Sequence, residues 1–94
     1  MYPVSAVALT GSNQAVRATS GAYCGFTIRE TAGAVAVVRI YDNATTNSGT
    51  LLEEIALAAA ESAREYYQGG GVRCANGIYV NVVSGTVSGS IRIG

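Results

Sequence analysis

The sequence predicts an all-β protein: a small antiparallel β-sandwich, jelly-roll or immunoglobulin-like, with about eight strands. Apolar and polar residues alternate over residues 78–82 and again over 87–93, as they do in strands with one buried face. Ser84-Gly85 between these stretches has the composition of a two-residue turn. Turn residues recur about every eight to twelve positions, which is the spacing typical of a sandwich or small barrel.

The first half of the chain supplies four further expected strands, at residues 4–9, 14–19, 23–29 and 34–41. Short turns rich in Gly, Ser and Asn separate them. The stretch 34–41 is apolar on both faces at its start, which suits a central strand or one whose outer face meets a partner. A polar loop follows at 42–49, and Gly69-Gly70-Gly71 permits a sharp bend further along.

Residues 50–68 allow two interpretations. Their Leu, Ala, Glu and Arg residues have good helix propensity, and a single helix of about 15 residues fits them. The alternative is a hairpin of two strands with a turn near 58–60, in which Leu51, Ile55 and Leu57 pack inward and Glu53 shares their face. The all-β surroundings favour the hairpin, because tertiary context overrides propensity.

Composition indicates one domain, residues 1–94, since a chain of this length builds a single small core. All six cations are Arg and six acids balance them, so no net charge attracts nucleic acid or an anionic membrane. A weakly charged surface with zero net charge favours self-association. We therefore expect part of the surface to be covered by a partner or by copies of the protein.

No stretch reaches the roughly 18 apolar residues of a membrane span, and the N-terminus lacks the pattern of a secretory signal. We therefore expect the protein to fold in a cytoplasm. Cys24 alternates with Phe26 and Ile28 on the expected core side, and Cys74 precedes the Asn76-Gly77 turn. Buried, reduced thiols fit this setting, and a Cys24–Cys74 disulfide is the alternative.

The sequence lacks the combinations of side chains that enzymes commonly use for catalysis. There is no His or Lys to activate a Ser or Thr nucleophile. Glu53-Glu54 would point to opposite faces of a strand, and Gly69-Gly70-Gly71 lacks the Lys and the helix of a phosphate loop. Asp42-Asn43 offers a single acid to calcium, and two thiols without His make a poor zinc site. We expect no catalytic residues, no metal, no cofactor and no small-molecule substrate.

Tyrosines are the more informative side chains, because Tyr combines apolar area with a hydroxyl and is enriched at contact surfaces. Packing in the core or at sheet edges is the alternative for several of them, and the absence of Trp disfavours a sugar-stacking platform. Together with the doubly apolar strand, they define a candidate protein interface of six residues: Val35, Val37, Tyr41, Tyr66, Tyr67 and Tyr79.

Two motifs carry a resemblance to a known family. Ile40-Tyr41-Asp42-Asn43-Ala44 precedes a Ser/Thr/Gly loop, and Gly70-Gly71-Val72-Arg73-Cys74-Ala75-Asn76-Gly77-Ile78 follows two short strands. This arrangement resembles small β-sandwich virion proteins of tailed bacteriophages over residues 35–94. In size the chain is similar to capsid decoration (cement) proteins. Cys74 departs from the pattern, in which an aromatic residue is common, and the resemblance implies no catalytic residues.

The resemblance implies a capsid decoration protein that binds and stabilises the assembled head shell. Its partners would be the major capsid protein and copies of itself, and its location would be the capsid surface of a virion assembled in the bacterial cytoplasm. The alternative is a host- or glycan-binding module of a tail or head fibre, with tyrosines as the platform.

Overall fold

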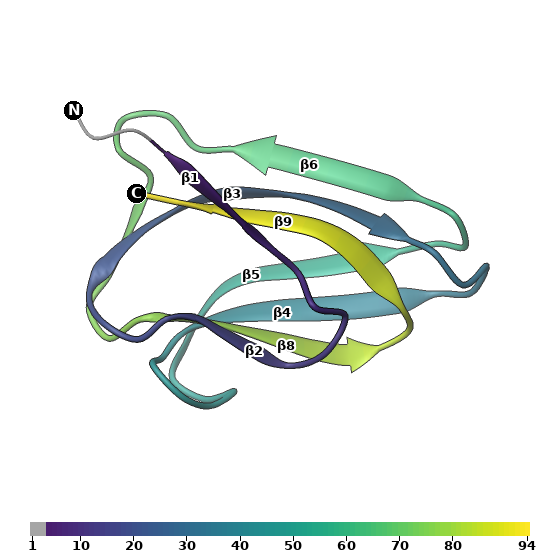
Figure 1. Cartoon of the computed structure of the whole chain (residues 1–94), viewed down its shortest axis with the longest axis horizontal. Coiled ribbons are helices and arrows are strands. Elements are labelled where there is room, and N and C mark those ends of the chain that lie inside the picture. Colours follow the sequence, from purple (N-terminus) through teal and green to yellow (C-terminus); the bar gives the residue numbers. More distant parts are fainter. Residues whose placement is uncertain (1–3) are drawn as a thin grey trace.

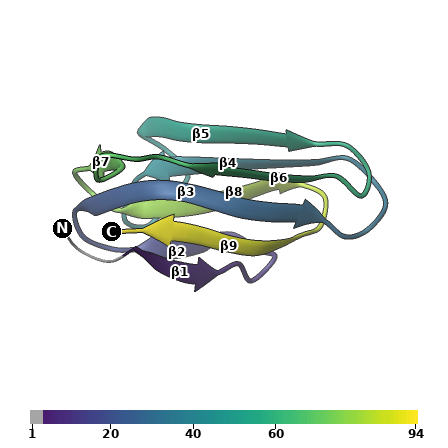
Figure 2. The same cartoon turned by 90° about the horizontal axis from the view of Figure 1, so that it is seen from above.

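The computed structural model describes residues 4–94 as two antiparallel sheets packed face to face. The first, here the β3 sheet, has the order β1 (Ser5–Ala8), β9 (Val87–Ile93), β3 (Gly21–Glu30), β6 (Ser62–Tyr66), with β7 (Val72–Cys74) also paired to β3. The second, the β4 sheet, has the order β2 (Gln14–Arg17), β8 (Ile78–Ser84), β4 (Ala36–Asp42), β5 (Thr50–Leu57). Figures 1 and 2 show the two layers, and the predicted all-β sandwich is confirmed.

The connections identify the kind of sandwich. Successive strands cross from one sheet to the other, except that β4 and β5 are neighbours in one sheet and β6 and β7 follow one another along β3. Two sheets interlocked in this way form a jelly roll, one of the two kinds of sandwich expected. The turn at Ser84-Gly85 is present, but it carries the chain between sheets, because β8 and β9 belong to different ones.

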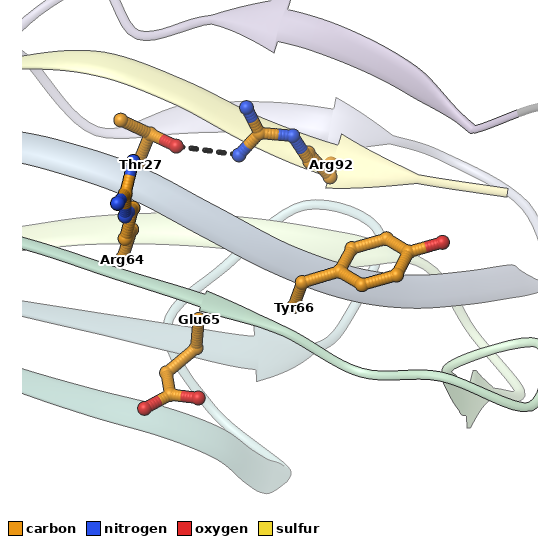
Figure 3. A pocket seen from close by; sticks show the side chains of 5 residues that line it. All are labelled: Thr27, Arg64, Glu65, Tyr66 and Arg92. Carbon is orange, nitrogen blue, oxygen red and sulfur yellow. Dashed lines mark hydrogen bonds between the residues drawn. The ribbon is translucent and has the colours of Figure 1, made fainter.

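A bulge in β3 changes which side chains face the core. Tyr23 pairs with Ile93 and Gly25 with Arg92, so β3 holds one residue more than its partner at this point. Gly25 has a φ of 135°, and a Cβ there would lie 2.1 Å from the Glu65 carbonyl oxygen. Only glycine fits such a position. Beyond the bulge Thr27 faces outward, as Figure 3 shows.

The bulge corrects the expectation for Cys24. Cys24 is buried, with 2% of its surface exposed, but it lies outside the core cluster that contains Phe26 and Ile28. Its Sγ instead lies 4.0 Å from the carbonyl oxygens of Ala22 and Gly70, under the glycine loop. Cys74 does belong to the core cluster, and both thiols are free in this structure.

The segment 50–68 is extended, which decides between the two interpretations, but it is not a hairpin within one sheet. β5 forms the edge of the β4 sheet and β6 lies on the β3 sheet, joined by a turn in which Ala60 has a φ of 59°. Ile55 and Leu57 are buried as expected, whereas Leu51 is 46% exposed. A register shift opposite Ile40 and Tyr41 leaves Leu51 beside Tyr41, on the outer face.

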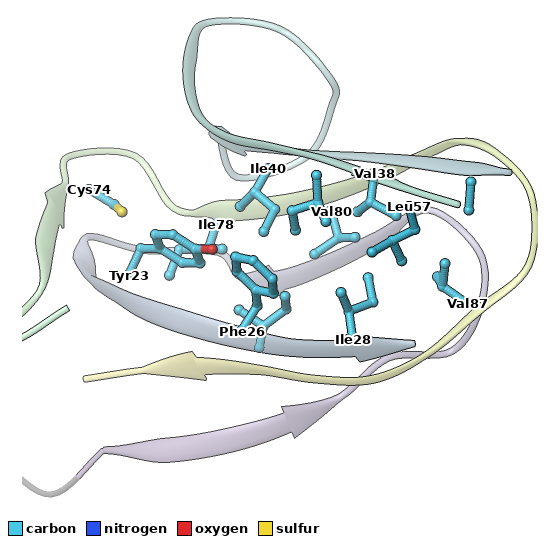
Figure 4. Packing of buried hydrophobic residues seen from close by; sticks show 13 residues of the cluster. Tyr23, Phe26, Ile28, Val38, Ile40, Leu57, Cys74, Ile78, Val80 and Val87 are labelled. Carbon is cyan, nitrogen blue, oxygen red and sulfur yellow. The ribbon is translucent and has the colours of Figure 1, made fainter. Parts of the chain in front are cut away.

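The core lies between the sheets and draws on both (Figure 4). From the β3 sheet come Tyr23, Phe26, Ile28 and Ile91, and from the β4 sheet come alternate residues of its two central strands. Fully burying a Val, Ile or Phe side chain stabilises the fold by about 1.5–3 kcal/mol. The central-strand residues are Ala36, Val38, Ile40, Ile78 and Val80.

Two carboxylates tie the turns together. Glu30, only 1% exposed, accepts backbone N–H hydrogen bonds from Ala32, Gly33 and Ala60, and so links the β3–β4 and β5–β6 turns. At the other end of β4, Asp42 accepts N–H bonds from Ala75, Asn76 and Gly77 at 2.8–3.3 Å. These amides lower the pKa of both carboxyls, with Ala60 and Asn76 the largest contributors.

Candidate functional site

The outer face of the β4 sheet carries four of the six candidate interface residues, three of them within its strands. Along β4, the inward residues Val38 and Ile40 are fully buried, so the alternating Val37 and Tyr41 point outward. Tyr79 points outward from β8 for the same reason, between the buried Ile78 and Val80. Each of the three outward residues is half-buried.

The strand register places Tyr41 and Tyr79 in one row across the sheet. Tyr41 is opposite Tyr79 on one side and opposite Leu51 on the other, and Tyr79 is opposite Ala15. Directly paired residues on one face of an antiparallel sheet have Cβ atoms about 4.5–5.5 Å apart. Two phenol rings, a leucine and an alanine therefore form a continuous apolar band across all four strands.

The next row is polar. Arg39 is opposite Asn81 and Glu54, and its Nε lies 2.6 Å from a Glu54 carboxylate oxygen. Hydrogen bonds with Glu54 and then Tyr41 raise the pKa of Arg39. The guanidinium is thus held in place and charged, in the middle of the face.

The third row is apolar again. Val37 is opposite Ala56 and Ser84, and Val83 sits at the register shift beside it with 47% of its surface exposed. Val35, just before β4, is 68% exposed, the highest fraction among the large exposed hydrophobic residues of the described chain. We call this surface the β4 outer face and define it by Val35, Val37, Arg39, Tyr41, Leu51, Glu54, Tyr79 and Val83.

The structure does not bring the other two candidates to the β4 outer face. Tyr66 lies on β6, on the outer side of the β3 sheet, where 57% of its surface is exposed (Figure 3). Tyr67 is turned inward against the core cluster. Its ring centroid lies 5.9 Å from that of Tyr23.

Tyr67 and Tyr23 share one carboxylate, that of Glu53, which lies on the inward face of β5 as the hairpin interpretation expected. Glu53 on β5 accepts hydrogen bonds from the hydroxyls of both tyrosines, that of Tyr23 at 3.2 Å. The bond to Glu53, followed by burial, raises the pKa of Tyr67 to about 12. Burial, followed by the charge of Glu53, raises the pKa of Tyr23. Both phenols therefore stay protonated near neutral pH and tie the two sheets together.

The carboxylate of Asp42 and the two thiols, which could in principle bind a metal or act as a nucleophile, serve the fold instead. The carboxylate oxygens of Asp42 accept hydrogen bonds from three backbone amides. No group of three or more metal-ligating side chains occurs within residues 4–94. Burial is the main reason that the pKa of both thiols is raised, which disfavours the reactive thiolate. Over the same residues, no helix is long and apolar enough to cross a membrane.

Comparison with known proteins returns no match from family models, from curated proteins or from solved structures.

Proposed function

We propose that the protein is a structural component of a tailed-bacteriophage virion, a capsid decoration protein whose β4 outer face docks on the assembled head shell. The observation that carries the proposal is the face itself: two apolar rows flank one ion pair on the outer side of one sheet. Protein interfaces are enriched in Tyr and Arg over such apolar surfaces, and exposed apolar patches mark interaction sites.

Two further observations support this proposal. The Asp42 carboxylate binds the amides of Ala75, Asn76 and Gly77, so the two motifs that resemble phage virion proteins are in direct contact. The jelly-roll arrangement is also common in viral capsid and lectin domains, although a fold is only an analogy for function.

The size of the face suggests how the protein would act. Four strands about 4.8 Å apart and about seven residues long cover on the order of 400 Å² in projection. Each partner in a complex of standard size buries roughly 800 Å², so one such contact is weak. Repeated copies that contact the major capsid protein and one another would bind tightly through multivalency. Bound in this way, they would stabilise the assembled shell.

Quantitative mass spectrometry of purified virions tests the proposal. We expect the protein on the capsid surface at a copy number comparable to that of the shell subunits. Tyr79→Glu, which places a charge in the centre of the face, should abolish capsid binding, whereas Ser12→Glu in the exposed β1–β2 turn should not. Absence from particles, or full binding by Tyr79→Glu, would contradict the proposal.

A second candidate is a host- or glycan-binding module on a tail or head fibre. It is favoured by the adjacent Tyr41 and Tyr79, with Arg39 in the neighbouring row to donate hydrogen bonds. A fibre module would be present at only a few copies per particle. It would also bind neutral oligosaccharides through the tyrosine row, which the decoration protein does not require.

A further inference from the structure

The outer face of the β3 sheet is very different from the β4 outer face, because it gathers four of the six arginines. On β3, Arg29 alternates with the buried Ile28 and Glu30 and so points outward. By pairing, Arg64 lies opposite Thr27, Arg92 opposite Gly25, and Arg73 opposite Ala22. We call this surface the arginine face and define it by Arg29, Arg64, Arg73 and Arg92.

The acids of the protein do not neutralise this face. Within residues 4–94 the one ion pair is Arg39–Glu54, on the opposite sheet. Glu30 and Asp42 bind turn amides, and Glu53 binds two tyrosine hydroxyls. Glu61 accepts the Ala58 N–H of its own turn. Glu65 points away from Arg64 and Arg92 in Figure 3.

The arginines are spaced along one direction. Successive rows of β3 at Arg29, Thr27 and Gly25 are about 6.6 Å apart, and the row at Ala22 lies about 10 Å further, at about 3.3 Å per residue. Each row carries one arginine, contributed in turn by β3, β6, β9 and β7. The positive charges therefore form a staggered band roughly 23 Å long, in which β6 and β9 lie on opposite sides of β3.

Two neighbouring hollows run along the same band. One is lined by Thr27, Arg64, Glu65, Tyr66 and Arg92, and the other by Thr27, Ser62, Ala63 and Arg64. Arg92 donates a hydrogen bond to the Thr27 hydroxyl at the floor of the first (Figure 3). The shared residues Thr27 and Arg64 make the two hollows one shallow groove over the outer surface of β3 and β6.

We propose that the arginine face binds a linear acidic polysaccharide in this groove. Guanidinium groups pair with carboxylate or sulfate groups in bidentate fashion, and a band of them matches a polymer whose charges repeat. Hydroxyls of Thr27, Ser62, Ser88 and Ser90 lie between the arginines, where they can bond sugar hydroxyls. Among residues 4–94, Tyr66 alone offers an exposed ring on this face, whereas single-stranded nucleic acid is bound on several stacked aromatics.

This inference goes beyond the proposed function and uses the sheet opposite to the docking face. A decoration protein seated on its β4 outer face would present the arginine face to the surroundings of the particle. The polysaccharide test needs only the purified protein, so it can fail while capsid docking stands, and the reverse also holds.

Binding to fluorescently labelled polygalacturonate, in which every sugar carries a carboxylate, tests the inference at about 0.1 M salt. We expect binding that weakens as salt rises, and none to neutral dextran. The double variant Arg29→Gln/Arg64→Gln removes two exposed guanidiniums and should lower affinity about tenfold or more. Arg17→Gln is a control on β2 of the other sheet, where the guanidinium donates a hydrogen bond to the Ser20 carbonyl oxygen, and it should change the affinity less than about twofold.

Three outcomes would overturn the inference: no binding to polygalacturonate, equal weakening by Arg17→Gln, or tighter binding to a 20-nucleotide oligo-dT. The last outcome would assign the face to nucleic acid instead. Circular dichroism of each variant checks the fold. If the double variant does not fold, Arg73→Gln on β7 tests the same face independently, with an expected loss of a few fold.

Discussion

At the scale of single residues, the acids of this chain are structural groups. Asp42 accepts hydrogen bonds from three backbone amides of a turn distant in the sequence. Glu30 accepts them from Ala32 and Gly33 of the turn that follows it and from the distant Ala60. Gly77 shows how tightly one of these turns is held, since a Cβ there would lie 2.4 Å from the Arg17 carbonyl oxygen. Sequence analysis recognised Asp42 as part of a motif. It missed Glu30, because nothing local shows that a Glu after Arg29 will meet Ala60.

Glu30→Gln should lower the melting temperature at pH 7 by several degrees, because an amide has one acceptor oxygen where the carboxylate has two. The folded pKa of Glu30 is lowered by its amide partners. The unfolded chain therefore binds protons first as pH falls, and this stability is lost below the ordinary Glu value of about 4.3. Thermal melts from pH 7 to pH 3 should show a shallower acid decline in the variant than in the wild type. An unchanged slope would contradict this assignment.

The two cysteines should differ in their tolerance of serine. Cys74 lies in the core beside Tyr23, so Cys74→Ser should cost about 1–3 kcal/mol of unfolding free energy. Cys24→Ser should cost less, since its Sγ already lies near the carbonyl oxygens of Ala22 and Gly70. Urea denaturation measures both. Neither thiol should react quickly with iodoacetamide before unfolding, and a wild-type mass two units low would instead show a disulfide.

At the scale of elements, the sequence predicted where strands lie better than how they pair. Alternation located β3, β8 and β9, and a stretch apolar on both faces located β4, because these patterns are local properties of the sequence. Pairing depends on residues far apart, so the sequence did not show that β5 and β6 join opposite sheets. The same holds for the bulge at Gly25, which moved Cys24 out of the core and depends on β6 passing close by.

Glu53 is the clearest element-scale case, since a carboxylate on the inner side of β5 is tolerated only because Tyr23 and Tyr67 reach it from the other sheet. Tyr67→Phe should cost about 1 kcal/mol, measured by urea denaturation. The Tyr23→Phe/Tyr67→Phe double variant should cost more than the sum of the single changes, because Glu53 then loses both partners. Strict additivity would argue that the two tyrosines act separately.

The hydrogen bond from Tyr67 to Glu53 also predicts that the folded protein loses stability at alkaline pH. The pKa of Tyr67 is raised from 10.0 to about 12, so between these values the folded chain holds a proton that the unfolded chain releases. Stability should therefore fall as pH rises above about 10. Absorbance titration at alkaline pH should show Tyr67 and Tyr23 ionising late in the folded protein, and Tyr67→Phe should remove the contribution of Tyr67 while that of Tyr23 remains.

At the scale of the whole molecule, zero net charge conceals two unlike faces. One carries apolar rows around an ion pair, and the other carries four arginines among hydroxyls. The sequence predicted exposed apolar residues at Val37, Tyr41 and Tyr79, because they alternate with obvious core residues. It did not predict the arginine face, since those residues come from four strands that only the sheet topology brings together.

This asymmetry predicts how the isolated protein associates. Copies should meet through the β4 outer face, because removing apolar area from water favours contact there while the arginine faces repel one another. Sedimentation velocity over a wide concentration range should show reversible association that persists in high salt. Tyr79→Glu should shift the protein to monomer, and Ser12→Glu should not. A monomer at every concentration that also fails to bind capsids would argue against a docking role for this face, whereas association abolished by salt would place the contact on charged residues instead.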